Sequence, residues 1–263
     1  MSASRTQAEI VMRSLRAAKV IGHRGLAGLA PENTMAAFAA AADAGLRWVE
    51  LDAKLCASGE LVVLHDNTLE RTSNGQGRAE HMDWSTLRRL DAGRWFDARF
   101  AGERIPLLSE VLAFCAERGI GINIELKPNP SDYVKTARVL AELLRAGRWL
   151  ERLPLLASSF SRQSLRAIQR YLPALPRGFL LERRWPAAAI LAELDALQAV
   201  SFHYDDRLIS AELIATVRAT GRDVLVWTVN DGDRAEALWR QGVTAVFSDL
   251  PLLPVTRSGA GSH

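Results

Sequence analysis

Strand-like segments alternate with helix-like segments along almost the whole chain, and this alternation restricts the fold more than any other feature of the sequence. Eight segments have the apolar composition of buried strands, and helical patterns separate them. They comprise residues 19–25, 48–56, 121–127, 153–158, 177–182, 199–203, 223–229 and 244–248. Eight strand–helix units favour a closed parallel TIM (β/α)8 barrel over an open doubly wound sheet, and no Gly-x-Gly-x-x-Gly motif indicates a dinucleotide site. The sequence therefore predicts an α/β fold in which residues 1–263 form a single barrel domain.

Residues 48–66 predict a β-hairpin that brings acidic groups and a histidine together. Its two strands flank a turn at residues 57–60, with Gly59 where a turn needs positive φ. If the turn is centred there, paired residue numbers sum to about 117, which puts Asp52 opposite His65. Glu50 lies on the same strand face as Asp52. These acids could be solvated, with His65 ending the hairpin. However, they interrupt an otherwise apolar strand, and a buried charge needs a partner or a metal.

The strand at residues 121–127 supplies a third acidic group. Its isoleucines and leucine are expected to face the outer helices, so Asn123, Glu125 and Lys127 should face the barrel interior or its mouth. A parallel strand buried on both faces is normally apolar throughout, so three polar residues need an explanation. A structural Glu125–Lys127 ion pair is one. A third metal carboxylate beside a phosphate-binding lysine is favoured, because Glu50 and Asp52 already offer the oxygen ligands that hard cations prefer.

Other polar residues also fall where predicted strands end. The first strand leaves His23 and Arg24 at its C-terminal end, and His203 and Trp227 occupy similar positions later in the chain. Active sites of TIM barrels form at the C-terminal ends of the strands. We therefore expect the functional site at this face. For His203, a satisfied histidine near the rim is at least as good an interpretation as a substrate contact.

Residues 67–104 interrupt the alternation of strands and helices. A structureless loop of this length is unusual in a compact domain, so we expect a small folded insertion after the hairpin. Because it follows His65 directly, it should lie over the same end of the barrel. It contains four aromatic residues, most of which we interpret as its own small core: Trp84, Trp95, Phe96 and Phe100.

Composition excludes several classes of protein. The 33 basic and 30 acidic residues give a net charge of +3 and are scattered, which argues against nucleic acid binding. Cys56 and Cys115 lack metal-ligand spacing and fit a reducing compartment. No apolar core of a signal peptide and no stretch of about 20 apolar residues is present. We expect a cytoplasmic protein without stable membrane association, ending in a disordered Gly/Ser-rich tail at residues 255–263. The oligomeric state is not indicated.

Five ordered motifs resemble those of the glycerophosphodiester phosphodiesterase family, particularly its short cytoplasmic bacterial members. The resemblance extends from about residue 20 to residue 251, with further similar segments at residues 159–160, 227–230 and 247–251. It implies a (β/α)8 barrel with an insertion beside the active site, a divalent metal, and hydrolysis of a small-molecule glycerophosphodiester to glycerol 3-phosphate and an alcohol. The five motifs are residues 22–25 (Gly-His-Arg-Gly), 31–34 (Pro-Glu-Asn-Thr), 50–52 (Glu-Leu-Asp), 65–66 (His-Asp) and 125–127 (Glu-Leu-Lys).

The chemistry of phosphodiester hydrolysis suggests a role for each candidate residue. Glu50, Asp52 and Glu125 would hold the ion, Mg²⁺ in the first place and Mn²⁺ or Ca²⁺ as alternatives. Arg24 and Lys127 would balance the phosphate charge, and the resemblance suggests Trp227 as a wall for the glycerol. Histidines titrate at about pH 6.5, so His23 is interpreted as the base and His65 as the acid.

Two other functions are compatible with the sequence. One is a phospholipase-like phosphodiesterase or lyase that acts on lipids, although no apolar membrane-binding loop supports it. The other is a barrel that binds glycerophosphodiesters without turnover, although both histidines are present. For the hydrolase, we expect the alcohol group of the substrate to matter little. Attack by water and formation of a cyclic phosphate both remain open.

Overall fold

The computed structural model describes residues 3–252, and eight parallel strands in it close into a barrel. Each strand pairs with its neighbours around the ring, and the pairing of Gly22 with Val49 closes it. The predicted TIM barrel is therefore confirmed. The tail predicted at residues 255–263 lies outside the described residues. The parallel strands are β1 (Val20–Gly22), β2 (Trp48–Leu55), β4 (Gly121–Leu126), β5 (Leu155–Ser159), β6 (Arg177–Leu181), β7 (Ser201–Asp205), β8 (Asp223–Trp227) and β9 (Ala245–Ser248).

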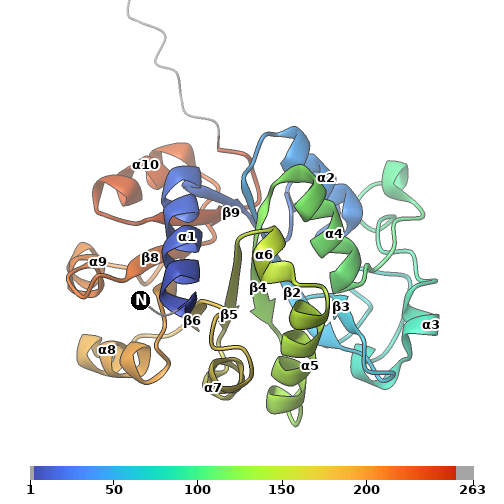
Figure 1. Cartoon of the computed structure of the whole chain (residues 1–263). Helices are drawn as coiled ribbons and strands as arrows, with labels where there is room; N and C mark the ends of the chain where they lie inside the picture. Colours follow the sequence, from blue (N-terminus) through green and yellow to red (C-terminus); the bar gives the residue numbers. More distant parts are fainter. Residues whose placement is uncertain (1–2, 253–263) are drawn as a thin grey trace, which may run out of the picture.

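Figure 1 looks along the barrel, with the outer helices arranged around the strands. Apolar residues of the strands and of these helices form two large clusters between the two layers. Thr34 starts the first outer helix by accepting a hydrogen bond from the Ala37 amide at 3.4 Å. The outer helices are α2 (Met35–Asp43), α4 (Leu108–Arg118), α5 (Tyr133–Ala146), α7 (Arg162–Tyr171), α8 (Ala187–Ala196), α9 (Ala211–Arg218) and α10 (Gly232–Arg240), with the short α6 (Trp149–Arg152) after α5.

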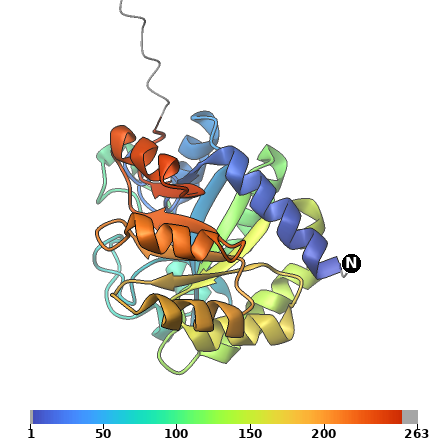
Figure 2. The same ribbon diagram turned by 90° about the vertical axis from the view of Figure 1, so that its left-hand side faces the viewer.

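The N-terminal helix α1 (Ala3–Ala18) closes one end of the barrel and leaves the other end for the site. It lies in front of the strands in Figure 1 and at the right in Figure 2. Val11, Met12 and Leu15 pack against apolar side chains inside the barrel, among them Leu156 and Leu225. The N-terminal end of the barrel is thus filled by apolar side chains. None of the described helices is both long and apolar enough to cross a bilayer.

The hairpin forms, but its register differs by one residue from the predicted one. The return strand β3 (Leu61–Val63) pairs antiparallel with β2, and Ala53 lies opposite Val63. Asp52 is therefore opposite Leu64, whose amide donates to the Asp52 carbonyl at 2.9 Å, and the predicted opposition of Asp52 and His65 is wrong. The cause is a three-residue loop closed by the Cys56 amide and the Glu60 carbonyl, with Gly59 at φ +97°.

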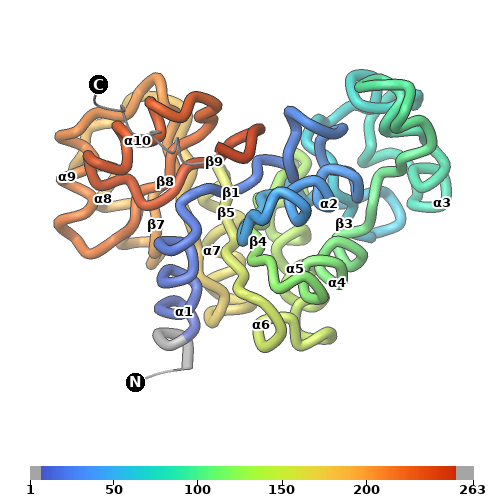
Figure 3. Tube along the Cα trace, turned by 90° about the horizontal axis from the view of Figure 1, so that it is seen from above, coloured from blue at the N-terminus to red at the C-terminus, as the bar shows by residue number. Residues whose placement is uncertain are grey.

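The segment at residues 67–104 is folded and lies at the opposite end of the barrel from α1 (Figure 3). It contains the short helices η1 (Ala79–His81), α3 (Trp84–Leu87) and η2 (Ala98–Phe100) over a small core of mainly aliphatic residues. Trp84 packs against this core, but Trp95, Phe96 and Phe100 contact one another edge to face, and Trp95 is 41% exposed. The interpretation of most of these aromatics as the core of the insertion is therefore wrong.

Candidate active site

A cavity of about 780 Å³ opens at the C-terminal ends of the strands, where the barrel fold predicts a site. Asp52 is buried beside Glu50 and Glu125, next to this cavity. The structure thus brings all eight candidate residues from the sequence to one place. Those that line the cavity are His23, Arg24, Glu50, His65, Glu125, Lys127 and Trp227.

Three buried carboxylates form the centre of the site. Glu50 and Asp52 share one face of β2, and Asp52 pairs in register with Glu125 on β4. One oxygen from each residue lies within 4.8 Å of the others. This spacing follows from the two-residue period of a strand and the parallel pairing of two neighbours.

Basic and amide groups partly balance these carboxylates. Lys127 Nζ lies 3.0 Å from Glu125 Oε1 and 3.8 Å from Asp52 Oδ1, and Arg24 Nε lies 3.4 Å from Asp52 Oδ2. The amide of Arg24 donates to Glu50 Oε2 at 2.9 Å. Asn33, whose φ is +58°, donates its side-chain amide to Asp52 Oδ2 at 2.8 Å. Asp52 therefore receives more stabilisation than Glu50.

The pKa values of the carboxyl groups reflect this difference. Burial, together with repulsion from Asp52 and Glu125, raises the pKa of Glu50 well above its usual value. Burial also raises the pKa of Glu125, although Lys127 opposes it. Burial acts in the same direction on Asp52, but Lys127 and Arg24 outweigh it and lower its pKa. Too little positive charge surrounds the three carboxyl groups for all of them to be ionised together. A bound divalent cation would supply the missing positive charge. The oxygen donors of the three groups fit such an ion.

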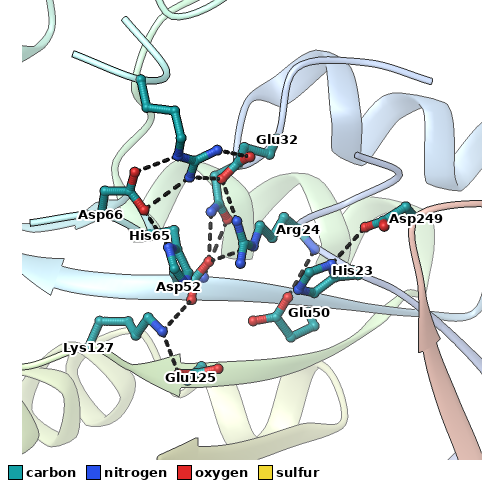
Figure 4. Close-up of polar contacts among 12 residues, drawn as sticks. His23, Arg24, Glu32, Glu50, Asp52, His65, Asp66, Glu125, Lys127 and Asp249 are labelled. Atoms are coloured by element: carbon teal, nitrogen blue, oxygen red, sulfur yellow. Dashed lines mark hydrogen bonds and ion pairs between the residues drawn. The ribbon is translucent and has the colours of Figure 1, made fainter. Parts of the chain in front are cut away.

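Each candidate histidine is paired with a carboxylate through Nδ1. His23 Nδ1 lies 2.7 Å from Asp249 Oδ1, and His65 Nδ1 lies 2.6 Å from Asp66 Oδ1. Figure 4 shows the two pairs on opposite sides of the central carboxylates. When Nδ1–H donates a hydrogen bond to the carboxylate, Nε2 is left as the nitrogen that can exchange a proton at the cavity.

The pKa of His65 is lower than the ordinary value of a histidine. Burial lowers it, and the nearby Asp52 carboxylate only partly offsets that effect. The Asp52 carboxylate therefore favours the protonated form of His65 but does not outweigh burial.

A charged chain of side chains joins His65 to Arg24 (Figure 4). Arg71, from the segment at residues 67–104, contacts Asp66 at 2.5 Å through Nε and Glu32 at 2.7 Å through Nη1. Glu32 Oε1 in turn accepts from Arg24 Nη1 at 2.6 Å. The guanidinium of Arg71 thus holds Asp66, which is the partner of His65, and Glu32, which is the partner of Arg24.

Lys54 is a buried cation on the same face of β2 as Glu50 and Asp52. It lines the cavity and donates to Asn67 Oδ1 at 2.6 Å. Burial, together with the nearby ammonium of Lys127, lowers its pKa to about 8. The ring of Trp227, which also lines the cavity, meets Phe160 edge to face, with the two centroids 5.8 Å apart.

His203 lies inside the barrel and away from the cavity. Strand β7 continues to Asp205, so His203 is in the middle of the strand and not at its end as the sequence suggested. Its ring is fully buried, and Nε2 lies 2.8 Å from Ser201 Oγ. Burial lowers its pKa to about 3, so it is neutral. This position does not favour a substrate contact, but the interpretation as a satisfied histidine near the rim is also wrong, because the buried Nδ1 has no hydrogen-bond partner among the described residues.

The sequence reasoning gave no role to several residues of the site. Glu32, Asp66 and Asp249 stand inside motifs that carry the family resemblance, so their position next to a functional histidine or arginine was a usable signal. Lys54 follows Asp52 with the same two-residue period and could have been found in the same way. Nothing in the sequence pattern marks Arg71.

The comparison with protein families adds to this geometry. The model of a family described as "Glycerophosphoryl diester phosphodiesterase family" matches residues 23–253, a range that includes every candidate site residue. A glycerophosphodiester phosphodiesterase of Caldanaerobacter subterraneus is 34% identical to the chain over 246 residues, which cover 91% of this chain and 98% of that protein.

Solved structures with the same fold are also similar. A phosphodiesterase of Oleispira antarctica in complex with the product sn-glycerol-3-phosphate has a TM-score of 0.86 and 35% identity, over 89% of this chain and 94% of its own. A glycerophosphodiester phosphodiesterase of Agrobacterium tumefaciens has a TM-score of 0.73 and 30% identity, over 89% and 96%. The similarity thus covers the barrel and the cavity together.

Proposed function

The chain belongs to the glycerophosphodiester phosphodiesterase family, and on this premise we propose that it hydrolyses small glycerophosphodiesters with the help of a divalent ion. The products are glycerol 3-phosphate and an alcohol, and the relative that binds sn-glycerol-3-phosphate supports this choice. The observation that carries the proposal is the cluster of Glu50, Asp52 and Glu125 between two histidine–carboxylate pairs in one cavity.

The polar side chains divide the electrostatic task among them. A divalent ion held by the three carboxylates would act as a Lewis acid on the phosphoryl oxygens, and an all-oxygen site suits Mg²⁺ and also admits Mn²⁺ or Ca²⁺. Arg24 and Lys127 lie within 4 Å of these carboxylates and bind the remaining negative charge of the phosphate. Glu32 keeps the guanidinium of Arg24 in place.

The two histidines provide proton transfer on either side of the phosphate. His23 takes the proton of the attacking nucleophile, which is water or, if a cyclic phosphate forms first, the glycerol hydroxyl and then the water that opens the ring, and Asp249 stabilises the resulting charge. His65 donates a proton to the departing alkoxide, and Asp66 orients its ring. The aromatic pair Trp227 and Phe160 forms the wall against which the glycerol group packs.

We place this activity in the cytoplasm and direct it at soluble diesters. Two free buried cysteines, Cys56 and Cys115, fit a reducing compartment. We therefore expect glycerophosphocholine to be hydrolysed much faster than a bilayer phospholipid, and the comparison of the two rates tests the substrate class.

The proposed function is tested by measuring release of glycerol 3-phosphate. The purified protein is incubated with the glycerol phosphodiesters of choline, ethanolamine, serine and glycerol, in the presence of Mg²⁺, Mn²⁺, Ca²⁺ or EDTA. We expect product with at least one metal and none after complete chelation. Full activity in EDTA contradicts the role of the metal, and absence of product under every condition contradicts the hydrolase.

Replacing Arg71 by Met should lower kcat/KM for the choline ester by about 10–100-fold, the usual effect of removing a residue that orients catalytic groups. The variant frees Asp66 and Glu32, which hold His65 and Arg24. Because Arg71 acts through the acid His65, the loss should be smaller with a nitrophenyl ester. Arg71→Lys keeps the positive charge but cannot make the paired guanidinium contacts, so its kcat/KM should lie between those of the wild type and Arg71→Met.

A second arginine of the same segment serves as the control for this experiment. The side chain of Arg94 is exposed, and its one ion pair among the described residues is a 3.9 Å contact with Asp91, so Arg94→Met should leave kcat/KM unchanged. If Arg71→Met keeps full activity on the choline ester, or loses the same factor on both esters, Arg71 does not position the acid.

A further inference from the structure

The proposed reaction leaves one buried cation of the cavity without a task. Lys54 is 1% exposed and lines the cavity, and its Nζ donates to Asn67 Oδ1 at 2.6 Å and to the Lys127 carbonyl at 3.4 Å. Within residues 3–252, no carboxylate oxygen lies within 4.0 Å of this ammonium group. A buried charge without a counter-ion is costly, so the surroundings of Lys54 favour an anion supplied from the cavity.

The side chains around Lys54 offer it no ion pair, because the Asp52 and Glu80 carboxylates act on its charge only from beyond 4.0 Å. Lys127 and Arg78 are both positively charged and line the same cavity. The charge of Arg78 is already balanced by Glu80, whose oxygen lies 2.5 Å from its Nε. Asn67 contributes only a neutral amide. This side of the cavity is therefore positively charged and holds hydrogen-bond donors, whereas the wall at Trp227 and Phe160 is aromatic.

The position of Lys54 separates it from the groups that face the phosphate. Lys127 and Arg24 contact the central carboxylates directly, but Lys54 makes no contact of this kind. It lies two residues beyond Asp52 on β2, which corresponds to about 6.6 Å along the strand towards the mouth of the cavity. A group displaced this far from the central carboxylates towards the mouth is placed to meet one of the two substituents of a phosphate bound there. With the glycerol against Trp227, the substituent next to Lys54 is the alcohol.

We propose that Lys54 binds the alcohol group of the substrate and makes the enzyme prefer alcohols that carry a carboxylate. The inference rests on the proposed function and replaces the expectation that the alcohol matters little. An alcohol carboxylate would accept a charge-assisted hydrogen bond from the ammonium group. A trimethylammonium group such as that of choline would meet positive charge and donors without an acceptor.

The serine and ethanolamine esters of glycerol phosphate test this proposal, because they differ only by one carboxylate. The wild-type protein should have the higher kcat/KM for the serine ester. Lys54→Met should lower the ratio of the two kcat/KM values by about tenfold or more, the usual scale for a hydrogen bond to a charged group. Lys54→Arg should retain most of the preference. Lys135→Met, which removes an exposed lysine of α5, should leave the ratio unchanged.

A second variant tests the same charge without removing it. Asn67→Asp places a carboxylate beside the ammonium of Lys54, so it should compete with the serine carboxylate and lower the ratio as well. This variant keeps the test valid if Lys54→Met does not fold. Circular dichroism and thermal unfolding establish which variants are folded.

The outcomes separate this inference from the proposed function. If Lys54→Met lowers kcat/KM for both esters by the same factor, Lys54 acts on the phosphate and the inference is wrong. An unchanged ratio in the folded Lys54 and Asn67 variants also overturns it. Both results leave the hydrolase intact, because the ethanolamine ester is still turned over by the wild-type protein. Absence of hydrolysis of every ester with every metal contradicts the proposed function itself.

Discussion

Glu50→Gln should abolish hydrolysis and, at the same time, stabilise the metal-free protein. Ionised Glu50 is buried and repelled by Asp52 and Glu125, and it accepts a hydrogen bond only from the Arg24 amide among the contacts of the described residues. Glutamine keeps an acceptor for this amide but removes the charge. Since the Lewis acid contributes several kcal/mol to the transition state, we expect kcat/KM to fall by about 10³-fold or more.

The expected gain in stability follows from the direction of the pKa shift. The pKa of Glu50 in the folded protein is raised above the usual value of 4.5. Its favourable contribution is therefore complete below pH 4.5 and is lost as the pH rises through the folded-state value. The metal-free variant and wild type should have similar free energies of unfolding near pH 4.5. At pH 7 the variant should be more stable, by a free energy on the order of 1 kcal/mol.

Thermal unfolding with and without metal measures both effects. Saturating Mg²⁺ at about 100 times its Kd should stabilise the wild type by about 2.7 kcal/mol and should barely change the Tm of Glu50→Gln. Titration calorimetry should show loss of binding, and Asp52→Asn and Glu125→Gln should lose activity and binding as well. Glu117→Gln, on the exposed face of α4, is the control and should behave as wild type. Retained metal binding in all three variants contradicts the assignment of the ligands.

The central carboxylates could be predicted from the sequence because they depend on local periodicity. Glu50, Asp52 and Glu125 follow from the two-residue period of strands and from the rule that barrel sites form at strand ends. The same reasoning misjudged the hairpin by one residue, because the Cys56–Glu60 closure that sets the register depends on loop geometry. It also misplaced His203, because it ended β7 two residues before its actual end at Asp205.

The partners of the histidines and of Arg24 could not be derived in this way. Asp249 contacts His23 across 226 positions in the sequence, and this contact exists only because β9 returns to β1 as the barrel closes. Arg71 reaches Glu32 across 39 positions through an irregular segment with no strand or helix period. A periodic pattern specifies which face a side chain occupies, whereas contacts of this kind depend on how the chain closes in space.

The two histidines should differ in their response to the leaving group. If His65 protonates the departing alkoxide, His65→Ala should lower kcat for the choline ester by about 10²–10⁴-fold. It should do much less harm with a nitrophenyl ester, because a phenolate leaves without full protonation. His23→Ala should be poor on both esters, since a better leaving group does not replace a missing base. His81→Ala removes an exposed histidine and should have no effect.

This comparison is needed to assign the roles, because the surroundings of the two rings in the structure are similar. Both rings contact a carboxylate through Nδ1, so the pairing alone does not distinguish acid from base. For His65, burial lowers the pKa, whereas Asp52 and Asp66 support the protonated form that an acid needs. Metal content has to be equal in all variants, since a lost ion would affect both esters. Equal losses of His65→Ala on the two esters contradict its role as the acid. Recovery of His23→Ala with the nitrophenyl ester means that His23 is the acid and His65 the base.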